Sequence, residues 1–185
     1  MNKANDLTFQ ELAGKLRVDH FKGTLICFDP GETTGLAIFK NGTLAESNQL
    51  ETKTVDQGSQ VVHNLFRTAT SFSNEITPTD GNRQIQVVME DYKIYGWKTD
   101  THAWAALHTP KFIGAIIALC YIHNIPYHLQ MAQQAKSFCT DDKLKQWGFY
   151  NRGMRHARDA IRHGAYYTLF NKDIYTLNWT DPQNY

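Results

Sequence analysis

Apolar and polar positions follow strand and helix periods in turn along the chain, which predicts an ordered series of elements. Residues 23–29 form an apolar run that stops at Pro30-Gly31, as expected of a buried strand. Asn41-Gly42 lies between the apolar segments 36–39 and 43–50 and predicts a hairpin, so the first three strands should be antiparallel neighbours. Residues 85–90 and 125–130 are the expected fourth and fifth strands.

Helical spacing of apolar residues predicts three main helices, over 55–72, 102–123 and 152–170, and Pro110 marks a kink or second start in the middle one. Thr8 and Glu11 have the spacing of a capping box and predict a short helix over 9–17. After that short helix the order is βββαβαβα. This order is that of the ribonuclease-H-like fold, an α/β class with a mixed five-stranded sheet flanked by helices.

The chain of 185 residues has the length of one such domain. We expect an N-terminal helical extension over 1–22, the α/β domain over 23–170 and a C-terminal tail over 171–185. No apolar stretch resembles a signal peptide or reaches the roughly 20 residues of a membrane span, so a cytoplasmic protein without membrane contact is predicted. There is no P-loop or Rossmann fingerprint, and hence no expected nucleotide cofactor.

Four residues in three separated places are candidate metal ligands and catalytic groups: Asp29 and Glu90 at strand ends, and His156 with Asp159 in the last helix. Strand ends gather at one edge of an α/β sheet, and residues three apart share one face of a helix. Such a set suits metal-dependent phosphodiester hydrolysis with two Mg²⁺ ions, for which Mn²⁺ can substitute. Asp29 would bridge both ions, Glu90 and Asp159 would hold one each, and His156 would ligate an ion or position the water.

Each of these residues also has a structural explanation. Asp29-Pro30-Gly31 could be only a turn, and His156 and Asp159 could form only the polar face of an amphipathic helix. Glu90 and Asp91 are adjacent in a strand and point to opposite sides, so at most one of them can reach the site. The hypothesis therefore rests on the whole set.

The sequence 25–37, LICFDPGETTGLA, resembles the opening strand of the RuvC family of Holliday-junction resolvases. Val87-Val-Met-Glu90 resembles its second acidic strand, and His156-Ala-Arg-Asp159 resembles its closing helix in a variant form. The resemblance covers roughly residues 23–170, and its divergence is typical of phage-encoded members, which act in the host cytoplasm. It implies a homodimeric endonuclease that binds four-way or other branched DNA and makes paired nicks, with helix 110–123 as the candidate dimer face.

Two segments are expected to contact DNA. The loop after Glu90 interleaves aromatic and basic side chains, and residues 136–163 carry seven Lys or Arg against three Asp. The expected contacts are Tyr92, Lys93, Tyr95, Trp97, Lys98, Lys136, Lys143, Lys145, Arg152, Arg155 and Arg158. Two alternatives stay open: a nuclease of the same fold that cleaves RNA–DNA hybrids or other branched DNA, and a junction-binding protein without catalysis.

Overall fold

A five-stranded mixed sheet forms the centre of the protein, in a computed structural model that describes residues 7–16, 23–74, 84–92 and 107–170. The strands are β1 (Gly23–Asp29), β2 (Thr33–Lys40), β3 (Thr43–Glu51), β4 (Gln84–Glu90) and β5 (Tyr127–Gln130). The strand order is β3-β2-β1-β4-β5; β1 pairs antiparallel with β2 and parallel with β4. The antiparallel meander expected of the first three strands is confirmed.

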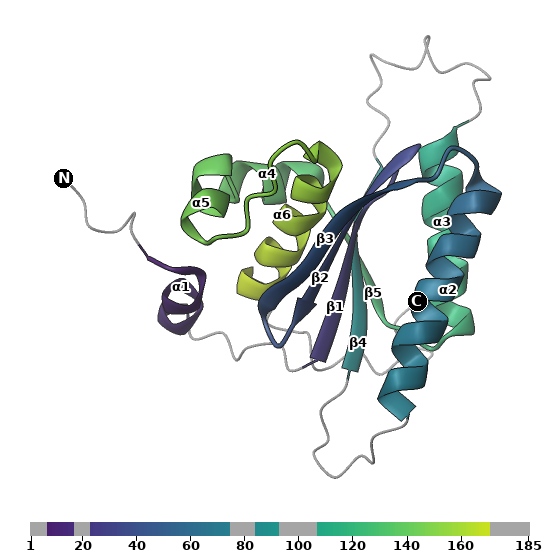
Figure 1. Cartoon of the computed structure of the whole chain (residues 1–185), viewed down its shortest axis with the longest axis horizontal. Coiled ribbons are helices and arrows are strands. Elements are labelled where there is room, and N and C mark those ends of the chain that lie inside the picture. The colour runs from purple at the N-terminus through teal and green to yellow at the C-terminus, as the bar shows by residue number, and fades with distance from the viewer. Residues whose placement is uncertain (1–6, 17–22, 75–83, 93–106, 171–185) are drawn as a thin grey trace.

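Helices cover both faces of the sheet (Figure 1). The helices are α1 (Phe9–Lys15), α2 (Val55–Asn74), α3 (His108–Ile122), α4 (Ala132–Phe138), α5 (Asp141–Gln146) and α6 (Arg155–Phe170). The helix α6 packs across β1 and β2 with α4 beside it, while α2 and α3 pair on the opposite face. This arrangement fits the α/β class predicted from the order of elements.

The alternation of side chains along β1 separates two apolar cores. Leu25 and Cys27 point toward α6, whereas Ile26 and Phe28 point toward α2 and α3, and all four are fully buried. Asp29 continues the first series, so the carboxylate that ends β1 belongs to the α6 face. The same alternation places Glu90 of β4 on that face, together with Val88.

Several boundaries differ from the predicted ones. The short helices α4 and α5 were not predicted, because 6 and 7 residues are too few to show a helical period. The last helix starts at Arg155 and not at residue 152, since Gly153 has a φ of 82° and interrupts the backbone there. The described part of the middle helix begins at His108, close to the second start expected at Pro110.

The capping box predicted at the N-terminus is confirmed, since the Thr8 hydroxyl and the Glu11 carboxylate each accept a hydrogen bond from the other residue's backbone N–H. Phe9 and Ala13 of α1 are buried against the core on the α6 side, where Phe9 packs on Trp147. Among the described residues, no helix combines the length and apolar character needed to cross a membrane.

Candidate functional site

The turn after β1 is fixed by two buried threonine hydroxyls. The oxygens of Thr34 and Thr52 lie 3.0 and 2.6 Å from the Gly31 carbonyl oxygen and 2.7 Å from each other. Both threonines are fully buried. Because buried hydroxyls with satisfied hydrogen bonds hold a defined geometry, this network holds the turn that directly follows Asp29.

Gly35 allows the start of α6 to reach this turn. It pairs with Asp29 across the β1–β2 ladder, and a Cβ added to it would lie 1.9 Å from the His156 carbonyl oxygen. No side chain fits at this distance, so only glycine permits the approach. From β3, the Gln49 side-chain oxygen accepts a 2.9 Å hydrogen bond from the His156 backbone N–H and satisfies one free donor of the helix terminus.

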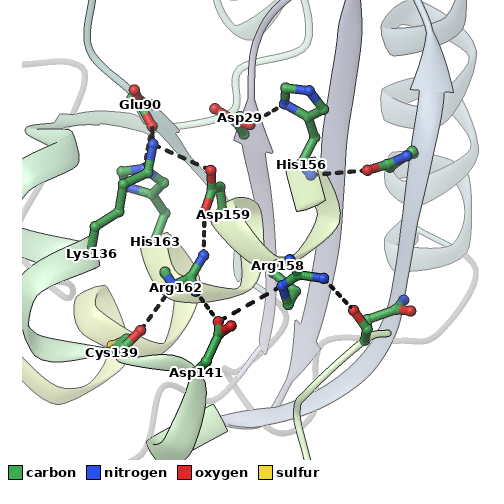
Figure 2. Close-up of polar contacts among 12 residues, drawn as sticks. Asp29, Glu90, Lys136, Cys139, Asp141, His156, Arg158, Asp159, Arg162 and His163 are labelled. Atoms are coloured by element: carbon green, nitrogen blue, oxygen red, sulfur yellow. Dashed lines mark hydrogen bonds and ion pairs between the residues drawn. The ribbon is translucent and has the colours of Figure 1, made fainter. Parts of the chain in front are cut away.

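His156 contacts Asp29 directly as a result. Its Nδ1 lies 2.8 Å from Asp29 Oδ2 (Figure 2), which leaves Nε2 as the ring nitrogen that can bind a metal or accept a proton. The pKa of Asp29 is raised to about 6, mainly by burial and also by the negative charges of Glu90 and Asp159, although the hydrogen bond from His156 lowers it in part. The three carboxylates therefore act on one another electrostatically.

Glu90 ends β4 and accepts contacts from two basic side chains. Its Oε2 lies 2.9 Å from Lys136 Nζ of α4 and 3.1 Å from His163 Nε2 of α6. Burial raises the pKa of Glu90, but the bonds from His163 and Lys136 outweigh it and lower the pKa to about 2. Glu90 is thus a firmly ionised carboxylate beside a positive charge.

Asp159 completes the set from the second turn of α6. Its Oδ2 lies 3.3 Å from the same Lys136 ammonium, and its Oδ1 pairs with Arg162. Arg162 also binds Asp141 at the start of α5 and the Cys139 carbonyl oxygen (Figure 2). These contacts connect the two short helices to the acidic site.

The structure places the four side chains on the α6 face as two contacting groups: His156 with Asp29, and Glu90 with Asp159 through Lys136 (Figure 2). Among the described residues, however, no three His, Cys, Asp or Glu side chains are close enough to hold an ion as they stand. The Lys136 ammonium lies between Glu90 and Asp159 and supplies the positive charge there. The three carboxylates fit the preference of Mg²⁺ and Mn²⁺ for oxygen ligands, whereas the imidazole is a ligand type that other divalent metals favour.

Apart from Lys136, the residues expected to contact DNA fall into four groups. Arg152 and Arg155 are exposed near the start of α6, and the Lys145 side chain is 57% exposed although its Nζ lies 3.4 Å from Asp142 Oδ1. Lys143 Nζ lies 3.5 Å from the centre of the Phe138 ring, and Arg158 bonds the Asn151 carbonyl oxygen and is only 16% exposed, so these two cations already have contacts within the protein. Tyr92 is half-buried against the α2–α3 core. Lys93, Tyr95, Trp97 and Lys98 lie outside the described residues.

The sequence interpretation missed residues that support the site. His163, Gln49 and Arg162 each orient one member of it, and no motif distinguishes them. His163 had one usable signal: it lies four residues after Asp159, which puts both on the same face of a helix.

Comparisons by sequence identify no relative: no family model matches the chain, and no curated protein is significantly similar to it. Comparison of structures gives clear matches. RuvC of Thermus thermophilus, solved in complex with a Holliday junction substrate, matches with a TM-score of 0.58 and 11% identity over 81% of this chain and 95% of that chain. Another structure of Thermus thermophilus RuvC matches with a TM-score of 0.55 and 12% identity, over 80% and 95%. The protein therefore has the RuvC type of ribonuclease-H-like fold, as predicted.

Proposed function

We propose that this protein is a metal-dependent endonuclease that cleaves four-way or branched DNA junctions. The observation that carries the proposal is the convergence of Asp29, Glu90, Asp159 and His156 on one face of a RuvC-type fold, at the ends of β1 and β4. Grouped carboxylates repel one another, and a cation among them removes the repulsion. We therefore favour a catalytic protein over one that binds junctions without catalysis.

Asp29, Glu90 and Asp159 would hold the two Mg²⁺ or Mn²⁺ ions, with His156 as a fourth candidate ligand. Such ions activate a water and stabilise the charge that develops on the attacked phosphate. A divalent ion bound by Glu90 and Asp159 competes with Lys136 for their oxygens. The lysine ammonium, once released, can contact a phosphate oxygen at the site.

His156 contributes through its free nitrogen. With Nδ1 hydrogen-bonded to Asp29, Nε2 can either ligate an ion or accept a proton from the attacking water, and the 42% exposure of the side chain leaves room for substrate. Asp29 orients this ring while its second oxygen remains for a cation. The turn network and Gly35 keep the two side chains at this distance.

A homodimer is part of the proposal, because two equivalent strands require two active sites related by a two-fold axis. The outer face of α3 carries Gly114, Ala118, Tyr121 and Ile122, which are all exposed. Ile116 of the same helix is fully buried in the core and is no candidate for the dimer contact. The face expected from the sequence is thereby reduced to these outward positions.

Cleavage of defined substrates tests the proposal. The purified protein is incubated with a labelled four-way junction, a linear duplex and an RNA–DNA hybrid, each with Mg²⁺, Mn²⁺ or chelator. Paired nicks confined to the junction, lost with chelator and in Glu90→Gln, are expected. Asp91→Asn is the matched control, because it removes the adjacent carboxylate, which the alternation of neighbouring residues predicts to point away from the site. Cleavage of the hybrid would indicate the ribonuclease alternative, and junction binding without any cleavage would contradict the enzyme.

DNA affinity separates the exposed cations from the internal ones. Arg155→Ala should weaken junction binding and reduce the slope of log Kd against log salt concentration by about one. The free energy of unfolding should not change. Arg158→Ala should mainly destabilise the protein, because its guanidinium is engaged with Asn151 and Asp141. Equal effects of the two substitutions on the salt slope would show that the DNA path differs from the proposed one.

A further inference from the structure

A buried histidine lies directly behind the acidic site. The His163 side chain is 0% exposed, and its ring lies between the last residues of two neighbouring strands. Nε2 is 3.1 Å from Glu90 Oε2, and Nδ1 is 2.7 Å from the Gln130 side-chain oxygen. Glu90 and Gln130 are paired in register across β4 and β5, so the ring joins two side chains that the sheet already holds side by side.

Donors and acceptors can be assigned in the contacts from Glu90 through His163 to Gln130. An ionised carboxylate can only accept, so the proton of the contact with Glu90 is carried by His163 Nε2. Gln130 can present either its carbonyl oxygen or its amide nitrogen to Nδ1, since the two ends of the amide are exchangeable by rotation. Both ring nitrogens are therefore satisfied, and the ring is fixed between its two partners.

His163 and Lys136 hold the same oxygen of Glu90 in different ways. The Lys136 side chain is 38% exposed and ends a long flexible stem, whereas the imidazole is enclosed by the core. If a divalent ion takes the place of the ammonium, the imidazole is the contact that can persist. The adjacent Arg162 is bonded to Asp159, so consecutive residues of α6 contact two different carboxylates of the site.

We propose that His163 is a positioning residue that orients Glu90 for a divalent ion, and that Gln130 fixes the ring from behind. The inference rests on the proposed function, because it assigns an ion to Glu90. Hydrogen bonds behind a ligand orient it and strengthen its binding, and their removal commonly reduces metal affinity by about 10–100-fold. A histidine that merely filled the core would affect unfolding and leave the affinity of the folded protein unchanged.

Binding of Mn²⁺ to the full-length protein without DNA tests this role, with free Mn²⁺ measured by electron paramagnetic resonance. In His163→Leu the affinity should fall by about 10–100-fold. His163→Gln places an amide donor near the position of Nε2 and should recover most of the affinity. Junction cleavage should show the same pattern: the Leu variant needs more Mn²⁺ for half its maximal rate, while the rate at saturating Mn²⁺ changes much less.

A folded His163→Leu protein that binds Mn²⁺ like the wild type would overturn the inference and leave the proposed function intact. Equal losses of affinity in the Gln and Leu variants would also overturn it, because the donor would then be irrelevant. If the Leu variant does not fold, Gln130→Met decides: it frees the ring from behind, and unchanged Mn²⁺ affinity would contradict the proposed role. A wild-type protein without Mn²⁺ binding would instead contradict the proposed function itself.

Discussion

The two faces of the sheet are built from the same strands but differ in the side chains that they bury. The α2–α3 face is packed with large apolar side chains, among them Phe28, Phe66 and Phe112, all fully buried. The α6 face has an apolar core at one end and, at the other, buried Asp29, Asp159 and His163. Alternation along each strand produces this division, because consecutive residues serve different faces.

This difference between the faces separates stability from function: the α2–α3 face mainly stabilises the fold, and the α6 face carries the candidate site. On the α2–α3 face, burial of apolar side chains favours folding without the need for hydrogen-bond partners. On the α6 face, buried polar groups cost free energy unless each one has a partner. Close contacts at glycines occur on both faces: a Cβ at Gly164 would lie 2.3 Å from the Phe39 ring, and one at Gly58 of α2 would lie 2.6 Å from the Phe112 ring. Substitutions on the two faces should therefore have different consequences.

Phe112→Ala is expected to have the largest effect on stability. The ring is fully buried on the α2–α3 face, and its removal should lower the free energy of unfolding by about 3–5 kcal/mol. The Mn²⁺ affinity of the protein that remains folded should be unchanged, since the site lies across the sheet. Urea unfolding and Mn²⁺ titration at low temperature measure the two quantities. A loss of affinity in the folded fraction would show that the faces are coupled.

Gly35→Ala should affect both stability and the site. Its Cβ would overlap the His156 carbonyl oxygen, so α6 must move, at a cost of about 3 kcal/mol. Because α6 carries His156 and Asp159, junction cleavage should also be lost. Gly31→Ala is the control from the same turn, because its Cβ would have 3.4 Å to the nearest atom, the Thr33 carbonyl oxygen. Similar effects of the two substitutions would contradict the close approach.

The contrast between Gly35 and His163 shows what the sequence could predict. Periodicity and the Asn41-Gly42 turn were sufficient for the five strands and their meander, because these signals are local. The spacing from Asp29 to Gly35 also carried the resemblance, and the structure gives its reason: the glycine faces the backbone of α6.

The support of the site could not be predicted in the same way. The contact of His163 with Glu90 joins residues 73 positions apart, and it depends on the register of β4 and β5 and on the rotation of α6. Lys136 was expected to contact DNA, but not to lie between two of the carboxylates. The short helix that carries it left no periodic signal.

Asp29→Asn should stabilise the ion-free protein near neutral pH. The pKa of Asp29 is raised to about 6 when folded, against about 3.9 when unfolded. The folded state therefore retains the proton longer, and stability falls as pH rises through this window, by up to about 3 kcal/mol. Asparagine does not ionise, so the variant should gain up to this amount above pH 6 and nothing near pH 4. Urea unfolding in chelator across this range measures the difference.

Glu90→Gln provides a control of opposite sign within the same site. The pKa of Glu90 is lowered to about 2 when folded, so its ionised form stabilises the protein above the unfolded pKa. Its replacement should destabilise the protein near neutral pH, and the loss should shrink as the pH falls from about 4 toward 2. If both substitutions shifted stability in the same direction at pH 7, the electrostatic description of the site would be wrong.

Gly114→Ala should have the smallest effect, and it examines the proposed dimer face. Gly114 lies within α3 with no heavy atom within 4 Å of the Cβ position, so alanine should stabilise the separate chain by about 0.5–1 kcal/mol. Gly14→Ala in α1 is equally unobstructed and is the control.

The dependence on protein concentration separates an effect within one chain from an effect at an interface. A gain in stability within one chain is independent of protein concentration, whereas a change in stability at an interface is not. If a second copy of the chain packs on α3, the gain in unfolding free energy from Gly114→Ala should shrink as the protein concentration rises. The variant's dimer, measured by sedimentation, should also dissociate more readily than that of the wild type. An equal gain at all concentrations would exclude Gly114 from the interface and restrict the dimer proposal to other surfaces.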